Sequence, residues 1–462
     1  MSKKVGPGAY IVEGDPPLSI VAVPTAVPAF IGYTGNAQKE GKSLSLEPTK
    51  ISSIKEYENF FGKGFSHRFT LAKDDSKDPH SGTLIGTADI AGTKYTITRQ
   101  TPDFCLYRSM QLFFENGGGP CYIVSAGSYK GKIEKETLQA GIDTLLKEEE
   151  PTILVIPEAI KLDSPAECYA LQQQMQIHCG EKMKNRVALL DVYDGFKDRK
   201  DPSGDCIKNF REGIGTFHLD YGAAYYPWLN ASLYFNQETI MKMITNKEIL
   251  GQNPDPGFYQ PILRVINDSL NLMAPSSAMA GIYCTNDSSR GVWKAPANLN
   301  LDSVVSPSVS ITSEEQEDLN RPGDGKAVNA IRAFPGEGIL VWGACTLDGN
   351  GRDWRYINVR RTEIMLEQSI RLTVKALIFK PNTEATWNSI DSAITEFLRG
   401  LWHQGGLAGA TPSDAFQVQV GLGKTMTKTD IQKGILRISI QVALCRPGEF
   451  INISIEQKQQ PS

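Results

Sequence analysis

The chain has 462 residues, of which 40% are hydrophobic and 22% charged, so it carries enough apolar material for about two to four globular domains. Its formal net charge of −4 excludes a general nucleic-acid coat, because such proteins depend on clustered lysine and arginine. No run approaches the ~18 apolar residues that a membrane-spanning helix needs, so we expect no direct membrane insertion.

The N-terminal sequence MSKKVGPGAYIVEGDPP lacks the continuous apolar core of a secretory signal, because proline and glycine interrupt it. We therefore expect synthesis in the cytoplasm without a signal peptide. The eight cysteines form no CxxC pair, and the five histidines show no HxxxH or HxH spacing. These patterns predict reduced, mostly buried thiols, no metal site and no cofactor.

The N-terminal end begins with an extended segment. Residues 5–28 combine β-branched residues with frequent proline, which blocks hydrogen bonding within a sheet, so they predict an arm that lies on another surface, such as a second chain. Residues 29–35 predict a buried strand, and residues 51–61 predict a helix with a serine cap. Residues 66–100 predict an inserted β-hairpin.

From residue 101 apolar strands alternate with amphipathic helices, a pattern typical of a parallel α/β layer. The expected strands lie at 121–126, 152–157, 186–192 and 222–229, and the expected helices at 103–119, 133–148 and 164–181. Residues 230–277 predict a mixed insertion.

The C-terminal part predicts a smaller α+β region. After loop-rich residues 299–337, the runs 338–347 and 354–359 flank the turn DGNGRD as a hairpin. Two helices follow, at about 360–376 and 384–402, and the chain ends in two β-runs that Arg446-Pro447-Gly448 separates. The expected fold class is α/β (α+β): a parallel or mixed sheet body with an inserted β-rich subdomain, a C-terminal α+β domain and extended arms at both ends.

Residues 418–427, VQVGLGKTMT, end like a phosphate-binding P-loop. The full motif needs another glycine five positions before Gly423, and Val418 stands there. Thr427 and Asp430 predict a helix start, but Gly434 ends that helix within two turns, too early for a helix that covers a sheet. The segment therefore predicts strand–turn–strand, with a nucleotide site as the alternative.

The other pieces that suggest catalysis have structural interpretations. Gly117-Gly118-Gly119 fits the left-handed end of a helix. The acidic turn at 348–353 lacks the glutamate of a calcium loop, because Val359 stands at its twelfth position. No G-x-S-x-G elbow occurs, so a hydrolase triad has no anchor.

Two clusters leave alternatives open. The aromatic run Tyr221, Tyr225, Tyr226 and Trp228 predicts a packed core or interface strand, with a ligand box as the alternative. Arg360-Arg361 predict a solvated or ion-paired face, with an acidic partner as the alternative. Neither cluster supplies catalytic residues, so the chain is expected not to be an enzyme.

Nine stretches together resemble contractile tail sheath proteins, a family of phage tails, bacteriocins and contractile injection systems. They occur in one order between about residue 5 and residue 455, and the inserts at 66–100 and 230–277 interrupt them. The stretches are PGAYIVEGDPP with VPTAVPAFIGYTG, FFENGGGPCYIV, YYPWL, AGIYCTNDSSRGVWKAPAN, LNRPGDGKAVNAIRAFPGEGILVWGACTL, WRYINVRR, FKPNTEATW, FLRGLWHQGGLAGATPSDAF and VGLGKTMTKTDIQKG. Cys345 and Lys380 depart from the family's usual arginine and acid, which affects charge pairing between subunits rather than the fold.

The resemblance implies a structural subunit that polymerises as helically stacked hexameric rings around an inner tube. The extended sheath is metastable in this family, and its contraction drives the tube through a target envelope. The implied partners are further copies of the chain, the inner tube protein, and baseplate and terminal cap proteins. The implied location is a phage tail or tail-like particle, including particles released outside the cell, and the C-terminal motifs favour an injection system.

The resemblance also assigns regions and residues. It implies an N-terminal arm at 1–28, a body at 29–329, a tube-facing domain at 330–445 and a C-terminal arm at 446–462. Exchange of strands between subunits would use Tyr10, Ile11, Val12, Ile20, Val21, Phe450, Ile451, Ile453 and Ile455. The candidate tube contacts are Arg399 and His403, on or beside the helix 384–402.

Two other functions stay open at this point. An α/β enzyme would use the GLGKT segment to bind a nucleotide. A static capsid or surface-layer protein would share the structural role but form one lattice only, without contraction.

Overall fold

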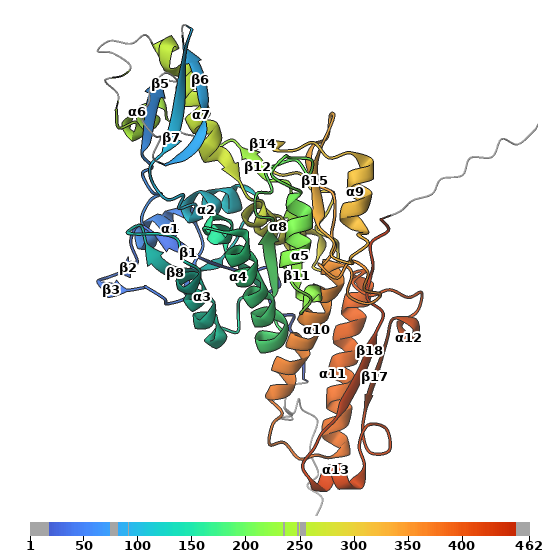
Figure 1. Ribbon diagram of the computed structural model, residues 1–462. Coiled ribbons are helices and arrows are strands. Elements are labelled where there is room, and N and C mark those ends of the chain that lie inside the picture. The colour runs from blue at the N-terminus through green and yellow to red at the C-terminus, as the bar shows by residue number, and fades with distance from the viewer. Residues whose placement is uncertain are drawn as a thin grey trace, which may run out of the picture. The chain divides into compact units, whose positions relative to one another are not determined.

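The computed structural model describes residues 18–73, 82–90, 92–233, 236–246, 249 and 256–449. The chain divides into two compact units (Figure 1). The first, called the body below, contains Pro24–Met365 together with the residues from Arg446 onward. The second, the C-terminal unit, contains Leu366–Cys445 with the residues up to Val23. Residues 330–365, which we expected in a tube-facing domain, thus group with the body.

The body is built on an eight-stranded sheet with the order β16-β15-β11-β10-β9-β1-β8-β4. β1, β8, β9, β10, β11 and β15 are parallel, and β4 and β16 pair antiparallel at the two ends. Their bounds are β1 Pro28–Thr34, β4 Thr49–Ile51, β8 Cys121–Ser128, β9 Ile153–Val155, β10 Val187–Asp191, β11 Gly222–Tyr226, β15 Asn329–Phe334 and β16 Gly338–Val341. All seven residues of β1 are buried, as a strand covered on both faces requires. The predicted parallel α/β layer is confirmed.

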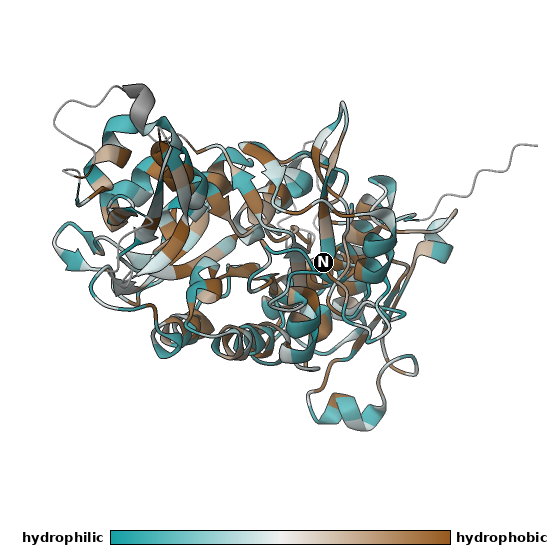
Figure 2. Ribbon diagram, turned by 45° about the horizontal axis from the view of Figure 1, so that its top comes forward, coloured by the Kyte–Doolittle hydropathy of each residue, from teal (hydrophilic) through white to brown (hydrophobic). Residues whose placement is uncertain are grey.

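Helices cover both faces of this sheet, and each face has its own hydrophobic core. One core joins Ile31 and Leu154 to helices α3, α4 and α5; the other joins Phe30 and Val155 to α1, α2 and α8. Hydropathy colouring shows the apolar residues on the strands and on the sheet-facing sides of the helices (Figure 2). These helices are α1 Ile54–Phe61, α2 Leu106–Glu115, α3 Lys135–Thr144, α4 Pro165–Ile177, α5 Cys206–Gly213 and α8 Ser276–Arg290.

The two inserts that sequence analysis placed at 66–100 and 230–277 form one subdomain (Figure 1). Its sheet has the order β5-β7-β6, and α6 and α7 pack on it around a third, separate core. The predicted hairpin is β6–β7, and β5 adds a third strand to it. The elements are β5 Phe69–Lys73, β6 Thr83–Ile90, β7 Thr93–Arg99, α6 Gln237–Met243 and α7 Pro256–Asn271.

The hairpin expected across DGNGRD does not form. β16 pairs with β15 instead, and the two sides of the turn are linked by an isolated bridge between Cys345 and Tyr356 and by the Thr346 hydroxyl, which donates to the Trp354 carbonyl at 2.8 Å. Helix α10 begins at Ile357, inside the run expected as a strand. Burial explains the difference, because residues 357–362 are all buried against the body and the tertiary packing outweighs local strand propensity.

The remaining elements of the body are short. The residues expected as loop at 299–337 contain β14 and α9 as well as β15. The bounds are β2 Gln38–Lys39, β3 Lys42–Ser43, β12 Leu229–Ala231, β13 Leu272–Met273, β14 Val304–Pro307 and α9 Ser313–Asn320. In the described residues, no helix is both long and apolar enough to cross a bilayer.

The C-terminal unit contains a helical pair and a two-stranded sheet. Helix α10 runs from the body into this unit, and α11 buries Ile390, Ile394, Leu398 and Leu401. Strands β17 and β18 pair antiparallel with Val418 opposite Ile440. The bounds are α10 Ile357–Lys375, α11 Glu384–His403, α12 Pro412–Ala415, β17 Phe416–Val420, α13 Lys428–Gln432 and β18 Ile438–Val442.

Candidate arm-anchoring site

The N-terminal arm joins the body at Thr25–Val27, which we call the N-terminal root. The Thr25 hydroxyl donates to Asp287 Oδ2 at 2.5 Å, and its carbonyl accepts from Arg361 Nη2 at 2.9 Å and from the Thr152 hydroxyl at 2.6 Å. Thr152 also binds the Val27 backbone, through its hydroxyl at 2.9 Å and its N–H at 2.8 Å. Residues of three distant parts of the body therefore fix this root.

Arg361 and Asp287 form the centre of the N-terminal root. The guanidinium bonds both carboxylate oxygens, at 3.0 Å and 2.6 Å, and both side chains are at most 5% exposed. Burial opposes the charge of Arg361, but Asp287 overcomes this effect and raises the pKa of the guanidinium. The same group lies 4.5 Å from the Tyr283 ring centroid, a cation–π contact.

The C-terminal arm leaves the body through Arg446–Glu449, the C-terminal root. The Glu449 carboxylate accepts from the Tyr356 hydroxyl at 3.1 Å, from Arg355 Nη2 at 3.3 Å and from the Cys345 thiol at 3.6 Å. Burial and the Glu449 charge raise the pKa of both Tyr356 and Cys345 to about 12, so both stay protonated as donors. The Glu449 side chain is 12% exposed, so this contact is largely dry.

One short segment, residues 355–361, therefore carries anchors for both arms. Arg355 and Tyr356 hold the C-terminal root, and Arg361 holds the N-terminal root. Between them, Arg360 forms ion pairs with Asp220 and Glu363 and stacks 3.7 Å from the Trp354 ring centroid. The ion-paired interpretation of Arg360-Arg361 is confirmed, and both side chains are buried rather than solvated.

The predicted arm residues divide by position. Ile20 and Val21 belong to the described residues, and neither of them is part of a strand. The Val21 side chain is 78% exposed. Two positions on, the Val23 N–H donates to the Ser369 hydroxyl at 3.0 Å, so this stretch follows α10 in the C-terminal unit. The other predicted positions lie outside the described residues; they are Tyr10, Ile11, Val12, Phe450, Ile451, Ile453 and Ile455.

The two candidate tube contacts lie on α11. Arg399 is exposed and pairs with Glu396 at 3.2 Å, one turn earlier on the same helix. His403 is exposed at the end of the helix and lies beside Trp402, with ring centroids 4.9 Å apart. Both side chains are therefore open to a partner.

Sequence reasoning missed three of the anchors: Asp287, which pairs with Arg361, and Arg355 and Glu449, which pair with each other. Asp287 lies in the family-like stretch AGIYCTNDSSRGVWKAPAN, 74 positions from Arg361. The usable signal was the pair Arg360-Arg361, which three residues separate from Trp354-Arg355-Tyr356, because buried arginines need nearby acids and often stack on rings.

The GLGKT segment forms a closed turn after β17. The Thr425 and Met426 N–H groups and, more weakly, that of Lys424 all point to the Gly421 carbonyl, at 3.0, 3.1 and 3.2 Å. A P-loop needs such N–H groups free to bind phosphate. Helix α13 has five residues, and Thr427 and Asp430 form the predicted capping box at its start. The strand–turn–strand prediction is confirmed apart from this short helix.

The aromatic run packs in the core, as predicted. Tyr225, Tyr226 and Trp228 are at most 4% exposed, and the Tyr225 hydroxyl bonds that of Tyr283 at 2.8 Å. The helix-capping role of the glycine triplet also holds, because α2 ends at Glu115 and Gly117 has a φ of +83°. No group of three or more His, Cys, Asp and Glu in the described residues could hold a metal ion.

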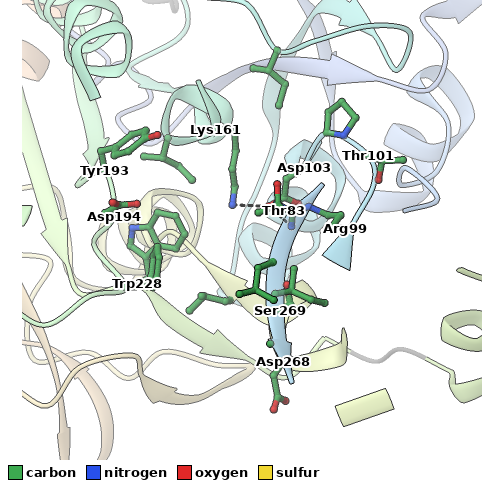
Figure 3. A pocket seen from close by; sticks show the side chains of 18 of the residues that line it. Thr83, Arg99, Thr101, Asp103, Lys161, Tyr193, Asp194, Trp228, Asp268 and Ser269 are labelled. Atoms are coloured by element: carbon green, nitrogen blue, oxygen red, sulfur yellow. Dashed lines mark ion pairs between the residues drawn. The ribbon is translucent and has the colours of Figure 1, made fainter. Parts of the chain in front are cut away.

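A cavity of about 780 Å³ lies beside the inserted subdomain, at the carboxyl ends of the parallel strands. Lys161 points into it and pairs with Asp103 at 2.6 Å (Figure 3). Asp103 also pairs with Arg108 of α2 and with Arg99 of β7, at 2.6 Å and 3.2 Å. Burial opposes the Asp103 charge, but these cations hold its pKa well below the usual range. The cluster joins the subdomain to the body.

Comparison with known proteins identifies the family. Residues 131–347 match the phage tail sheath protein central domain, and residues 350–458 match the phage tail sheath C-terminal domain. The two matches together cover more than half of the chain. This chain belongs to the phage tail sheath family.

Solved structures agree with this assignment over nearly the whole chain. The sheath of an extracellular contractile injection system, PVC, in its contracted state is 27% identical, covers 99% of both chains and gives a TM-score of 0.66. The contracted helical sheath of the anti-feeding prophage is 27% identical, covers 98% of this chain and 100% of that chain, and gives 0.65. The predicted fold class and family are confirmed.

Curated relatives match over a shorter stretch. The tail sheath protein of Vibrio phage KVP40 is 26% identical over 144 residues, which is 30% of this chain. The matched stretch spans about a fifth of that relative's length, 21%. The tail sheath proteins of Salmonella phage ViI and Enterobacteria phage T4 match over similarly short stretches, 144 and 141 residues.

Proposed function

We propose that the chain is the sheath subunit of a contractile injection particle. Copies polymerise as stacked hexameric rings around an inner tube, and contraction drives the tube through a target envelope. The observation that carries this proposal is the likeness, over 98–99% of the chain, to two sheaths in their contracted state. In such an assembly the subunit acts mechanically, and we propose no catalytic role.

The links between subunits are exchanged strands. In the described residues no third strand joins β17 and β18 along their lengths, so both outer edges of this sheet offer unpaired backbone groups. A lone two-stranded sheet is marginally stable, and open edges promote aggregation. The arms of neighbouring copies complete the sheet, and each added backbone hydrogen bond contributes a net ~0.5–1.5 kcal/mol.

The anchors explain how such links survive movement. Both roots are fixed to residues 355–361, so a pull on either arm reaches the body at the start of α10. Pro24 stands before the N-terminal root, and Pro447-Gly448 lie inside the C-terminal root. The linked subunits rotate about these points during contraction while the strand pairing persists. The contacts are heterologous, which generates a helical assembly.

The partners follow from the assembly. The inner tube protein contacts Arg399 and His403 on α11, which are both exposed. Baseplate and terminal cap proteins bind the ends of the sheath; relatives have been solved in anti-feeding prophage baseplates. The chain is made in the cytoplasm and ends in a phage tail-like particle, of which injection systems released outside the cell are the favoured kind.

Truncation tests the proposal. Removal of residues 1–22 leaves the N-terminal root in place, and removal of residues 450–462 leaves Glu449 in place. We expect the full chain to form ridged hollow cylinders in negative-stain images and each truncated chain to remain a folded monomer. Cylinders from both truncated chains would refute strand exchange. A single lattice in every condition, without a short and wide form, would favour the static alternative.

A further inference from the structure

The parallel core of the body has the strand order of a ligand-binding sheet. In space it reads β8-β1-β9-β10-β11, which by chain position is 2-1-3-4-5. In doubly wound sheets of this order, ligands bind outside the carboxyl ends of the strands, at the point where the order reverses. Here that point lies between β1 and β9.

The chain's own Glu158 occupies this point. It lies in the 3-10 helix Pro157–Lys161, directly after β9. Its carboxylate accepts from the Tyr33 N–H at the end of β1, at 2.7 Å, and from the Cys105 and Leu106 N–H groups at the start of α2, at 2.9 Å and 3.3 Å. The side chain is fully buried, and no lysine or arginine of the described residues forms an ion pair with it.

The backbone is shaped to receive an oxyanion. A Cβ atom on Gly32 would lie 2.8 Å from Glu158 Oε2, so glycine at this position leaves the space that the carboxylate needs. The cradle therefore consists of Gly32, Tyr33, Cys105 and Leu106: one residue without a side chain and three aimed N–H groups. A helix N-terminus adds its dipole, which favours a negative charge.

We propose that this cradle is an oxyanion-binding site that the chain fills with its own carboxylate. The ligand class it accepts is a small carboxylate, and a free one binds once the Glu158 side chain is removed. Glu158 thereby ties β1, α2 and the segment after β9 together, as a bound ligand does in other sheets of this order. This inference does not depend on the proposed sheath function.

Chemical rescue tests the proposal. Glu158→Ala removes the carboxylate and leaves three buried N–H groups without an acceptor, so the melting temperature should fall by several degrees. Sodium formate should restore part of the loss in a saturable way, while sodium chloride at equal ionic strength should not. Should the variant fail to fold, the yield of refolded protein in formate against chloride replaces the melting temperature.

Asp191 supplies the matched control. It is also buried and binds the start of a helix, but it accepts only one backbone N–H, from Ser276 at 2.9 Å, besides the Ser276 hydroxyl. We expect Asp191→Ala to lose stability without formate-specific recovery. Equal recovery of both variants, or no recovery of Glu158→Ala, would overturn the proposal.

A double-mutant cycle gives an independent result. Gly32→Ala alone should lower the melting temperature, because the new methyl group meets Glu158 Oε2 at 2.8 Å and, less closely, the Leu106 side chain at 3.1 Å. In the Glu158→Ala background the contact with the carboxylate is gone, so the same change should cost less, and it should abolish the formate effect because the methyl group enters the emptied cradle. Additive losses with an unchanged formate effect would contradict the assignment of Gly32.

Discussion

Arg361 bonds both carboxylate oxygens of Asp287 and, with the same guanidinium, the carbonyl of Thr25 at the N-terminal root. The pair is almost fully buried, so its charges have no water to replace a lost partner. A conservative change at this position therefore carries a large cost, because lysine cannot reproduce the two-point geometry.

Arg361→Lys should destabilise the body by about 2–4 kcal/mol, near the cost of breaking a buried ion pair. Thermal and denaturant unfolding of the monomer that lacks residues 1–22 measures the loss of stability. Negative-stain images of the full chain measure the yield of cylinders. The control is Arg437→Lys, because the Arg437–Asp430 pair is 57% exposed at the arginine and should matter little. Equal losses in the two variants would show that the buried Arg361–Asp287 pair does not stabilise the N-terminal root more than an exposed ion pair does.

Glu449→Gln should weaken the C-terminal root while leaving the body folded. The amide keeps the shape of the side chain but removes the charge that Arg355 and Tyr356 bind, a loss of about 1–3 kcal/mol. We expect fewer cylinders and a nearly unchanged circular dichroism spectrum. Glu238→Gln, exposed on α6 of the inserted subdomain, is the control and should leave the cylinder yield unchanged.

Local patterns predicted the elements that an unbroken apolar run or helical spacing marks within the segment itself. The buried run at 29–35, the capped helix at 51–61 and the helix at 164–181 correspond to β1, α1 and α4. The strand predicted at 354–359 was wrong. Helix α10 begins inside this run, and residues far away in the sequence bury its first turn. Asp287 could not be assigned to Arg361 either, since a spacing of 74 positions carries no local signal.

Lys424→Ala tests the nucleotide alternative. We expect no ATP-dependent change in melting temperature for either the parent or the variant, and equal cylinder yields. The reason is that the N–H groups of this turn already bond the Gly421 carbonyl. An ATP-dependent stabilisation that the variant loses would revive the enzyme hypothesis.

The contribution of Glu158 and Asp191 to the free energy of unfolding should fall as the pH rises from about 4.5 to 7, against an opposite contribution from His67 and His178, whose pKa burial lowers to about 3. Burial raises the pKa of Glu158 and of Asp191 to about 7, above their unfolded values. Both groups therefore favour the folded state at low pH, and this contribution is lost as the pH passes the folded pKa. Glu158→Gln should flatten part of the dependence, by up to ~3 kcal/mol over this range. The same pH dependence in the parent and in Glu158→Gln would contradict the raised pKa of Glu158.

Arg399→Glu should reduce assembly around the tube without unfolding the subunit, because the side chain is exposed and its only ion-pair partner among the described residues is Glu396. Co-expression with the tube protein and counting of filled particles measures the effect. Arg264→Glu, exposed on α7 of the inserted subdomain, is the matched charge reversal and should have no effect on tube filling.

The core of the inserted subdomain comes from two stretches of chain. In the sequence, strands β8, β9, β10 and β11 of the body sheet lie between these two stretches. If only one stretch is exchanged between homologous particles, its side of the core loses the residues it packs against. If both stretches are exchanged together, the core stays complete. A foreign domain that replaces this subdomain should therefore replace both stretches together. Asp103 and its three partners Arg99, Arg108 and Lys161 should be kept where the subdomain joins the body.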